Sequence, residues 1–166
     1  MARPDRVRIV GVRRPGQGAV RRAVAALAAT AFASAAWATE YRSVAQPAVM
    51  YDGPSKQARK LFAAPRGMPV EVISSLGPWV KVRDMAGDVV WIERPDLTDR
   101  RTVLAATIAA VRQQPRDAAP VLLHAERGVM LELVDPAARE ASGGWLQVRH
   151  REGGTGWVRI TEVWGW

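Results

Sequence analysis

One pattern occurs twice in this sequence, and it constrains the fold more than any bulk property does. Two tryptophans stand twelve positions apart as Trp79 and Trp91, and again as Trp145 and Trp157. Apolar and polar residues alternate around each tryptophan, and a turn that contains glycine separates the two alternating runs. Alternation with a period of two predicts β-strands, and the turn between them predicts a β-hairpin. A repeated hairpin indicates an internal duplication.

The duplication extends well beyond the hairpins. Residues 54–72 match residues 115–133 at a constant offset of 61. From Trp145 onward the offset is 66, because the second copy carries five extra residues within 135–142. This segment contains proline and serine and is typical of a surface loop, where insertions are tolerated. We therefore predict two units with the same backbone fold.

Each unit is predicted to consist of short strands. In the first copy, alternating or apolar runs bounded by turn residues predict strands at 41–44, 48–51, 61–62 and 69–73. A sheet of this kind removes its exposed edges when it closes into a small barrel. Domains of roughly 60 residues are marginally stable alone, so the two units are expected to touch.

The start of the second unit is the most ambiguous part of the sequence. Residues 100–114 are rich in alanine, which favours a helix by propensity. Their counterpart in the first copy contains Pro47, however, and proline breaks a helix interior. We therefore predict a strand at 102–107 and a short charged linker at 95–101.

The net charge of +8 does not describe a binding surface. Residues 1–38 hold seven arginines and one aspartate, which together supply +6. The remaining residues carry 17 basic and 15 acidic groups, a net of only +2. The basic excess therefore belongs to a leader, and no nucleic-acid partner is expected.

Residues 1–38 have the organisation of a secretory signal peptide. An arginine-rich start precedes an apolar run at 23–36, and Ala36-Trp37-Ala38 forms a small-x-small cleavage site. The alternatives are a short buried helix or an uncleaved membrane anchor. The run is shorter than the ~18–20 apolar residues that a spanning helix needs. We expect cleavage after Ala38, no integral membrane span in the mature chain, and a periplasmic or secreted location.

The residue types that catalysis or metal binding would need are sparse. The chain has no cysteine, which excludes disulfides and a thiolate zinc site. His124 falls opposite Ala63 in the repeat and His150 lies beside a hairpin turn, so both are expected on the surface. No serine, histidine and acid signature is recognisable. We expect no enzymatic activity, no metal and no cofactor.

Three segments of the second copy carry a family resemblance: RGVMLEL at 127–133, GWLQVR at 144–149 and GGTGWV at 153–158. In this order and spacing they resemble the bacterial SH3 domain, often called SH3b. The first copy is similar but looser, since Val90 replaces the glycine before its second tryptophan. The resemblance covers nearly all of residues 39–166. It implies an all-β fold of two tandem SH3-like small barrels behind a cleavable signal segment.

The predicted domains are the signal peptide at 1–38, the first barrel at 39–98 and the second barrel at 99–166. The resemblance also implies export and a non-catalytic role, since many members of this family are thought to recognise cell-wall peptides or protein segments. No enzyme domain is recognisable beside the two barrels, so the resemblance does not name the target.

Strand alternation places all four hairpin tryptophans on the polar side of their strands. Large aromatic side chains at such positions are candidate ligand platforms, because they offer rigid area and a polar N–H. The alternative is that each indole folds over the barrel rim and completes the core. If Trp79 or Trp145 forms a platform, its indole should be partly accessible. Trp164 and Trp166 are expected to plug a barrel or the seam between barrels.

Six residues are therefore candidate ligand contacts: Tyr51, Trp79, Trp91, Arg112, Trp145 and Trp157. Tyr51 precedes a turn near the predicted groove of the first barrel, and Arg112 holds the matching position in the second. The first groove would be aromatic, and the second would be mixed and better suited to a carboxylate. The predicted function is an exported binding module for an extended peptide, either a peptidoglycan stem or an envelope protein segment. The alternative is a structural subunit of an envelope complex with no cell-wall ligand.

Overall fold

The structure is a computed structural model that describes residues 39–135, 143–151 and 154–166. The predicted signal segment at 1–38 lies outside the described residues, as does most of the predicted insertion at 135–142. In the described part of the chain, no helix is long and apolar enough to cross a membrane. The described residues belong to one compact unit.

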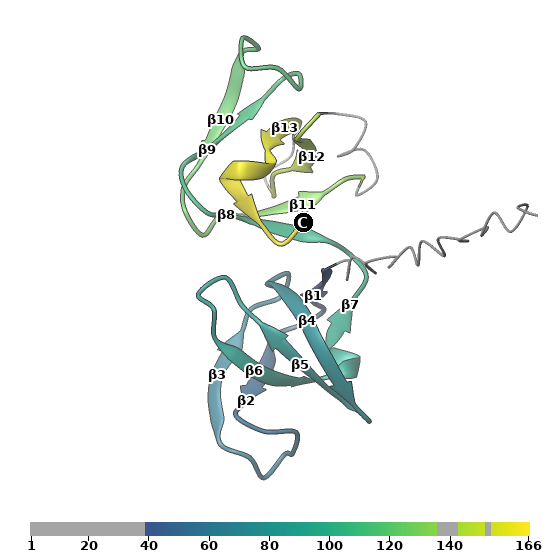
Figure 1. Cartoon of the computed structure of the whole chain (residues 1–166). Coiled ribbons are helices and arrows are strands. Elements are labelled where there is room, and N and C mark those ends of the chain that lie inside the picture. The colour runs from purple at the N-terminus through teal and green to yellow at the C-terminus, as the bar shows by residue number, and fades with distance from the viewer. Residues whose placement is uncertain (1–38, 136–142, 152–153) are drawn as a thin grey trace, which may run out of the picture. The chain divides into compact units, whose positions relative to one another are not determined.

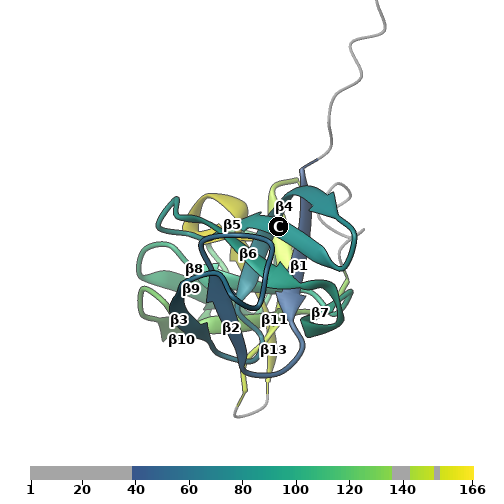
Figure 2. The same cartoon turned by 90° about the horizontal axis from the view of Figure 1, so that it is seen from below.

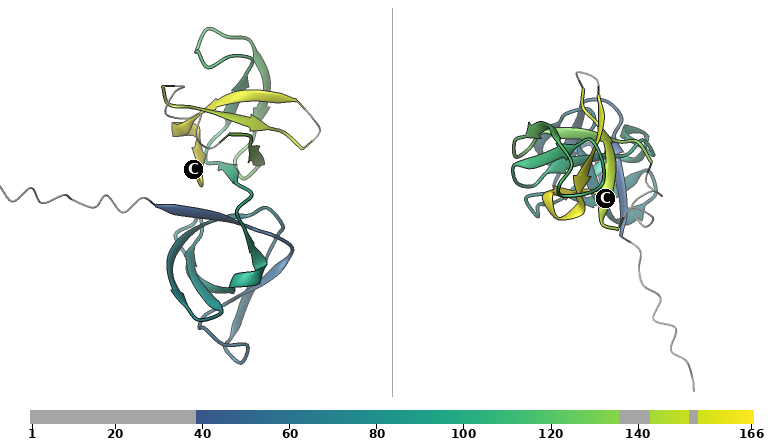
Figure 3. Two further views of the ribbon diagram at one scale, coloured as in Figure 1. Left: turned by 90° about the vertical axis from the view of Figure 1, so that its right-hand side faces the viewer. Right: turned by 90° about the horizontal axis from the view of Figure 1, so that it is seen from above.

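The first barrel is a seven-stranded antiparallel sheet with the strand order β3-β2-β6-β5-β4-β1-β7. Its strands curl round a common axis in the left view of Figure 3. The elements are β1 Glu40–Val44, β2 Ala48–Tyr51, β3 Lys60–Ala64, β4 Pro69–Leu76, β5 Trp79–Arg83, β6 Val89–Glu93, the 3-10 turn η1 Arg94–Asp96 and β7 Leu97–Thr98.

The second barrel repeats this topology with the order β10-β9-β13-β12-β11-β8-β14. Figures 1 and 2 show both barrels in two views. Its elements are β8 Thr102–Ala105, β9 Ala109–Arg112, β10 Val121–Ala125, β11 Met130–Leu133, β12 Trp145–Arg149, β13 Thr155–Arg159, the 3-10 turn η2 Ile160–Glu162 and β14 Val163–Trp164.

The two barrels correspond residue by residue, as the repeat predicted. Strands β2 and β9 coincide at an offset of 61, and β5 and β12 coincide at an offset of 66. The register agrees as well, since Trp79 faces Glu93 across β5 and β6, and Trp145 faces Arg159 across β12 and β13. The predicted all-β class and the pair of tandem barrels are confirmed.

Strand alternation fills each core. Val80, Val82 and Ile92 are buried in the first core, and Val148 occupies in the second core the position of Val82. The residue next to Val82 in sequence, Lys81, is only half-buried on the opposite face of the strand. Because the side-chain period is two, this register sends every second side chain of the hairpins away from the core.

Two details differ from the predictions. The segment predicted as a linker, 95–101, contributes most of η1 and all of β7 to the first barrel. Leu97 pairs with Val44 and packs against the first core, so this part of the chain is structural. The strand predicted at 102–107 exists, but β8 ends at Ala105.

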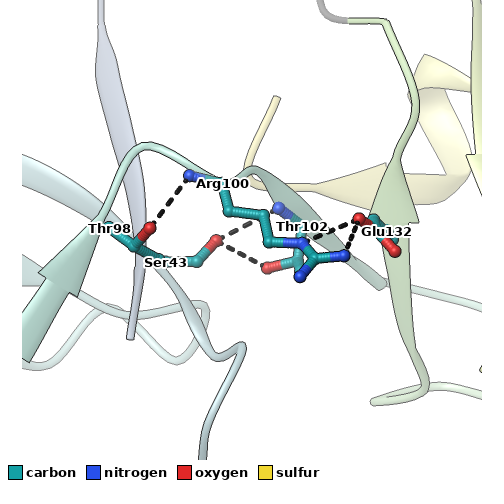
Figure 4. A network of polar contacts seen from close by, with 5 residues as sticks. All are labelled: Ser43, Thr98, Arg100, Thr102 and Glu132. Atoms are coloured by element: carbon teal, nitrogen blue, oxygen red, sulfur yellow. Dashed lines mark hydrogen bonds and ion pairs between the residues drawn. The ribbon is translucent and has the colours of Figure 1, made fainter. Parts of the chain in front are cut away.

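Contacts between the barrels join the beginning of the first to both ends of the second. The ring of Tyr41 in β1 makes an edge contact with Trp164 in β14, at 5.3 Å between centroids. Thr102 donates its backbone N–H to the Ser43 hydroxyl at 3.1 Å and its own hydroxyl to the Gly67 carbonyl. Figure 4 shows the Ser43–Thr102 contact.

The predicted roles of the last two tryptophans are confirmed. Trp164 lies at the seam through its contact with Tyr41, and Trp166 packs against the core of the second barrel.

Candidate functional site

The candidate site of the first barrel is the outer face of β2, β5 and β6, which we call the first aromatic face. Tyr51 pairs with Trp91 across β2 and β6, and Trp91 pairs with Lys81 across β6 and β5. Trp79 and Glu93 form the neighbouring row on the same face. None of these residues belongs to the hydrophobic core cluster of the first barrel. The register therefore gathers aromatic and charged side chains on one outer surface.

The two tryptophans of this face differ in exposure. Trp79 is only 8% exposed, and the ring of Tyr51 meets it edge-on at 5.2 Å between centroids. Trp91 is half-buried, and the ammonium of Lys81 lies 5.8 Å from the centre of its ring. An ammonium within about 6 Å of an indole face is attracted by the ring quadrupole. Trp91 is therefore the tryptophan of this face that a ligand can reach.

The second aromatic face is built from β9, β12 and β13. Trp157 pairs with Arg112 and with Gln147, in the row that matches Tyr51, Trp91 and Lys81. Trp145 is 4% exposed, and the guanidinium of Arg159 lies 4.5 Å from the centre of its ring. Trp157 is half-buried, like Trp91. An arginine thus covers the inner tryptophan here, where a tyrosine does so in the first barrel.

Trp79 and Trp145 do not meet the condition set for a ligand platform, because both indoles are buried. Strand alternation assigned them correctly to the outer face, but other side chains cover them there. Tyr51 covers Trp79, and Arg159 covers Trp145. The alternative, that the outer pair complete the cores, is not seen either, because among the described side chains neither Trp91 nor Trp157 packs against a core cluster.

Each face carries an ion pair that the sequence reasoning missed. In the first barrel Lys56 reaches Glu93 at 3.1 Å. In the second, Arg159 pairs with Asp117 through two hydrogen bonds, one of them 2.8 Å from Nε to Oδ1. By the two offsets, Asp117 matches Lys56 and Arg159 matches Glu93. The pair is therefore retained with its charges reversed. The offsets show that the positions are equivalent, but only the structure shows that they pair.

The loop between β9 and β10 is held against the second face by these arginines. Arg159 lowers the pKa of Asp117, chiefly because its guanidinium hydrogen-bonds to the carboxylate. The same hydrogen bond raises the pKa of Arg159. Arg112 donates from Nη1 to the carbonyl of Ala119 at 2.9 Å, and Ala119 is buried. The second face therefore has two arginines and one carboxylate, a net positive charge.

The chemistry available at these faces is binding by stacking, hydrogen bonding and charge. Within residues 39–135, 143–151 and 154–166, no group of three or more histidine, cysteine or acidic side chains could hold a metal ion. His124 is exposed, as predicted, whereas His150 is half-buried. Neither histidine belongs to an aromatic face.

Comparison with known families identifies the fold. The family model described as "Bacterial SH3 domain" matches residues 44–99 and again residues 105–165. The chain belongs to the bacterial SH3 domain family. The two matches coincide with the two barrels, so the tandem SH3 arrangement predicted from the repeat is confirmed. Both aromatic faces lie within the matched residues.

The SH3 pair also resembles solved structures at low identity. One is "NlpC2 from Trichomonas vaginalis", at 12% identity and a TM-score of 0.34, covering 76% of this chain and 48% of that chain. Another is an NlpC/P60 family protein from Bacillus cereus, at 15% identity and a TM-score of 0.33, covering 75% of this chain and 56% of that chain. The chain thus spans about half the length of these proteins. No curated protein matches.

Proposed function

We propose that this protein is an exported, non-catalytic binding module that recognises an extended peptide on its aromatic faces. The ligand would be a peptidoglycan stem or a segment of an envelope protein. The observation that carries the proposal is the half-buried tryptophan that each barrel holds outside its core, Trp91 in one and Trp157 in the other. An aromatic ring that is neither needed by the core nor fully covered is available for recognition.

The polar neighbours of these tryptophans suit a peptide. Lys81 and Glu93 flank Trp91, and together they offer a donor and an acceptor to peptide carbonyl and N–H groups. Gln147 and Arg112 flank Trp157, and the arginine suits a carboxylate. The covered tryptophans, Trp79 and Trp145, support the floor of each face. Their role in the proposal is to position the outer tryptophans rather than to contact the ligand.

Export and a periplasmic or secreted location remain part of the proposal. They rest on the arginine-rich start, the apolar run and the Ala36-Trp37-Ala38 site in the sequence. Sequencing the N-terminus of the exported protein tests them. We expect a mature chain that begins at Thr39, and an intact leader on the folded, exported protein would contradict this.

A specific observation favours the alternative of a structural subunit. The edge strands β3 and β10 expose apolar side chains at matching places, with Leu61 and Phe62 on the first and Leu122 on the second. Exposed apolar edge strands pair readily with other chains. If these edges rather than the aromatic faces make the functional contact, the protein assembles with envelope proteins and has no cell-wall ligand.

The test compares Trp91→Ala and Trp157→Ala with a control, Ile108→Ala. Ile108 is 69% exposed and lies outside both faces, so its truncation removes apolar surface without touching the site. Binding is measured by sedimentation with purified cell wall and by capture from envelope extract, with thermal melts alongside. Loss of an anchor is expected to weaken binding by about 2 kcal/mol or more, roughly thirtyfold. Normal binding by both tryptophan variants would favour the structural alternative.

A further inference from the structure

A cleft of about 740 Å³ opens between the barrels, away from both aromatic faces. Residues of the first barrel line one side, among them Ser43 and Arg66, and residues of the second line the other, among them Met130 and Arg149. Ligand pockets commonly measure about 300–1,000 Å³ and occur at domain interfaces. The cleft therefore has the size and the place of a binding site.

The charged residues that line the cleft are mostly cationic. Arg66, Arg100, Arg149 and Arg151 contribute to its wall, and Glu132 is the one acid among the described residues that line it. Arg100 donates to Glu132 from Nε at 2.8 Å and from Nη2 at 2.6 Å (Figure 4). That pair neutralises one arginine and the acid, so the remaining three arginines give the cleft a positive potential.

The internal repeat explains why Arg149 is available to a ligand. Its counterpart in the first barrel, Arg83, pairs with Glu71 at 2.9 Å across β4 and β5. Arg149 faces the equivalent acid, Glu132, across β11 and β12. In the second barrel, however, Glu132 forms its ion pair with Arg100 instead of Arg149. Consequently, no carboxylate of the described chain lies within ion-pairing distance of Arg149.

We infer that this cleft binds a small anion that carries two or more carboxylate or phosphate groups. Arginines from both barrels can then share one ligand, because Arg66 belongs to the first barrel and Arg149 and Arg151 to the second. The guanidinium fork pairs bidentately with carboxylate or phosphate. The inference does not depend on the aromatic faces, since no residue of either face lines the cleft.

The experiment is calorimetric titration of the mature protein at low ionic strength, with citrate as the carboxylate probe and pyrophosphate as the phosphate probe. We expect one site per chain for at least one probe, and the stronger probe identifies the anionic group. Affinity should fall with added salt, because added ions screen the attraction between the exposed arginines and the anion. Absence of saturable binding by both probes overturns the inference.

Matched variants separate the cleft from general surface charge. Arg149→Gln should weaken binding by about tenfold, the usual scale for one charge-assisted hydrogen bond, while Arg83→Gln, its counterpart outside the cleft, should leave affinity unchanged. Glu132→Gln should strengthen binding several-fold, because it releases Arg100 and removes the one acid, whereas Glu71→Gln should not. Thermal melts confirm that each variant is folded. Equal losses for Arg149→Gln and Arg83→Gln would show that the arginines act only as diffuse charge.

Discussion

The two barrels have the same strand order and register, yet their outer surfaces differ. Tyr51 covers the inner tryptophan of the first barrel, and Arg159 covers that of the second. The backbone is held by the buried core positions, and those of the first core cluster are apolar in both copies except at Gly156, the counterpart of Val90. The outer face is under no such constraint, so the same architecture carries a tyrosine and a lysine over its tryptophans in one copy and an arginine in the other.

The ion pairs show how the surfaces diverged. Lys56–Glu93 and Asp117–Arg159 occupy equivalent places with opposite polarity, so both members changed and the attraction was kept. A change in one member alone would have placed like charges together. In contrast, the strand pair Glu71–Arg83 of the first barrel has no equivalent in the second, where Glu132 pairs with Arg100 instead of Arg149.

The largest effect on stability is expected at Gly156, whose counterpart in the first barrel is the buried Val90. A Cβ at Gly156 would lie 2.5 Å from Cγ1 of Val111 and 2.9 Å from the carbonyl oxygen of Arg112. Gly156→Val should therefore destabilise the second barrel by about 3 kcal/mol or more, because the carbonyl belongs to a paired strand and cannot move aside. Hydrogen exchange, read separately for each barrel, measures this. The first barrel is the internal control, and an unchanged second barrel would contradict the close packing.

The equivalence of the cores is tested by Val82→Ala and Val148→Ala. Both side chains are fully buried, so each loss should cost about 1–3 kcal/mol in the free energy of unfolding. The controls Lys81→Ala and Gln147→Ala remove half-buried side chains from the opposite face and should cost well under about 1 kcal/mol. Denaturant unfolding measures all four. Equal losses on both faces would mean that the register of the hairpins is wrong.

The polarity of the ion pair in the second barrel can be reversed to match that of the first. The double variant Asp117→Lys with Arg159→Glu gives the second barrel the polarity of the first, and the fold should survive because the pair remains complementary. Its binding of carboxylate-bearing peptides should weaken, because the cation over Trp145 is lost. Asp117→Lys alone should be less stable than the double variant, since it sets a lysine against Arg159. Melting temperatures that do not distinguish the single from the double variant would show that the pair is not coupled.

The smallest effect is expected from pH. The pKa of Asp117 is lowered in the folded state, so its contribution to stability is present above the unfolded pKa and is lost as pH falls through the folded pKa. Acidification should therefore weaken the second barrel of the wild-type protein slightly more than it weakens the second barrel of the Asp117→Asn variant. Hydrogen-exchange rates of the second barrel, measured from neutral to acidic pH, check this. Parallel profiles for the wild-type protein and the variant would show that the Asp117–Arg159 pair does not contribute to stability.

Most of the fold could be predicted from the sequence, because each copy of the repeat supports the interpretation of the other. A hairpin read uncertainly in one copy is supported by its counterpart, and the strand at Thr102 was predicted only because Pro47 stands in the other copy. The two-residue strands β7 and β14 were missed, since two residues show no periodicity. Leu97 was consequently read as part of a linker, although it packs against the first core.

The candidate site was predictable only in part. Alternation determines which face a side chain occupies, and none of the four hairpin tryptophans belongs to a core cluster, although Trp79 and Trp145 are buried. It does not determine what lies above that face. Asp117 and Arg159 are distant in sequence, and their pairing over Trp145 follows from how the loop folds back. Cover of this kind is a tertiary property, which local patterns do not report.

The contact of Trp164 with Tyr41 has a consequence for how the chain is made. Residues of the first barrel leave the ribosome first, and domains generally fold in that order during synthesis. The ring of Tyr41 then lacks its contact with Trp164 until almost all of the described chain has been translated, although Arg101, whose guanidinium lies 5.7 Å from the centre of the ring, is made earlier. A nascent chain halted before Trp164 would expose this ring and the neighbouring Pro69, against which Gly165 closes tightly. Completion of the seam is thus a late, non-local event in the folding of the two barrels.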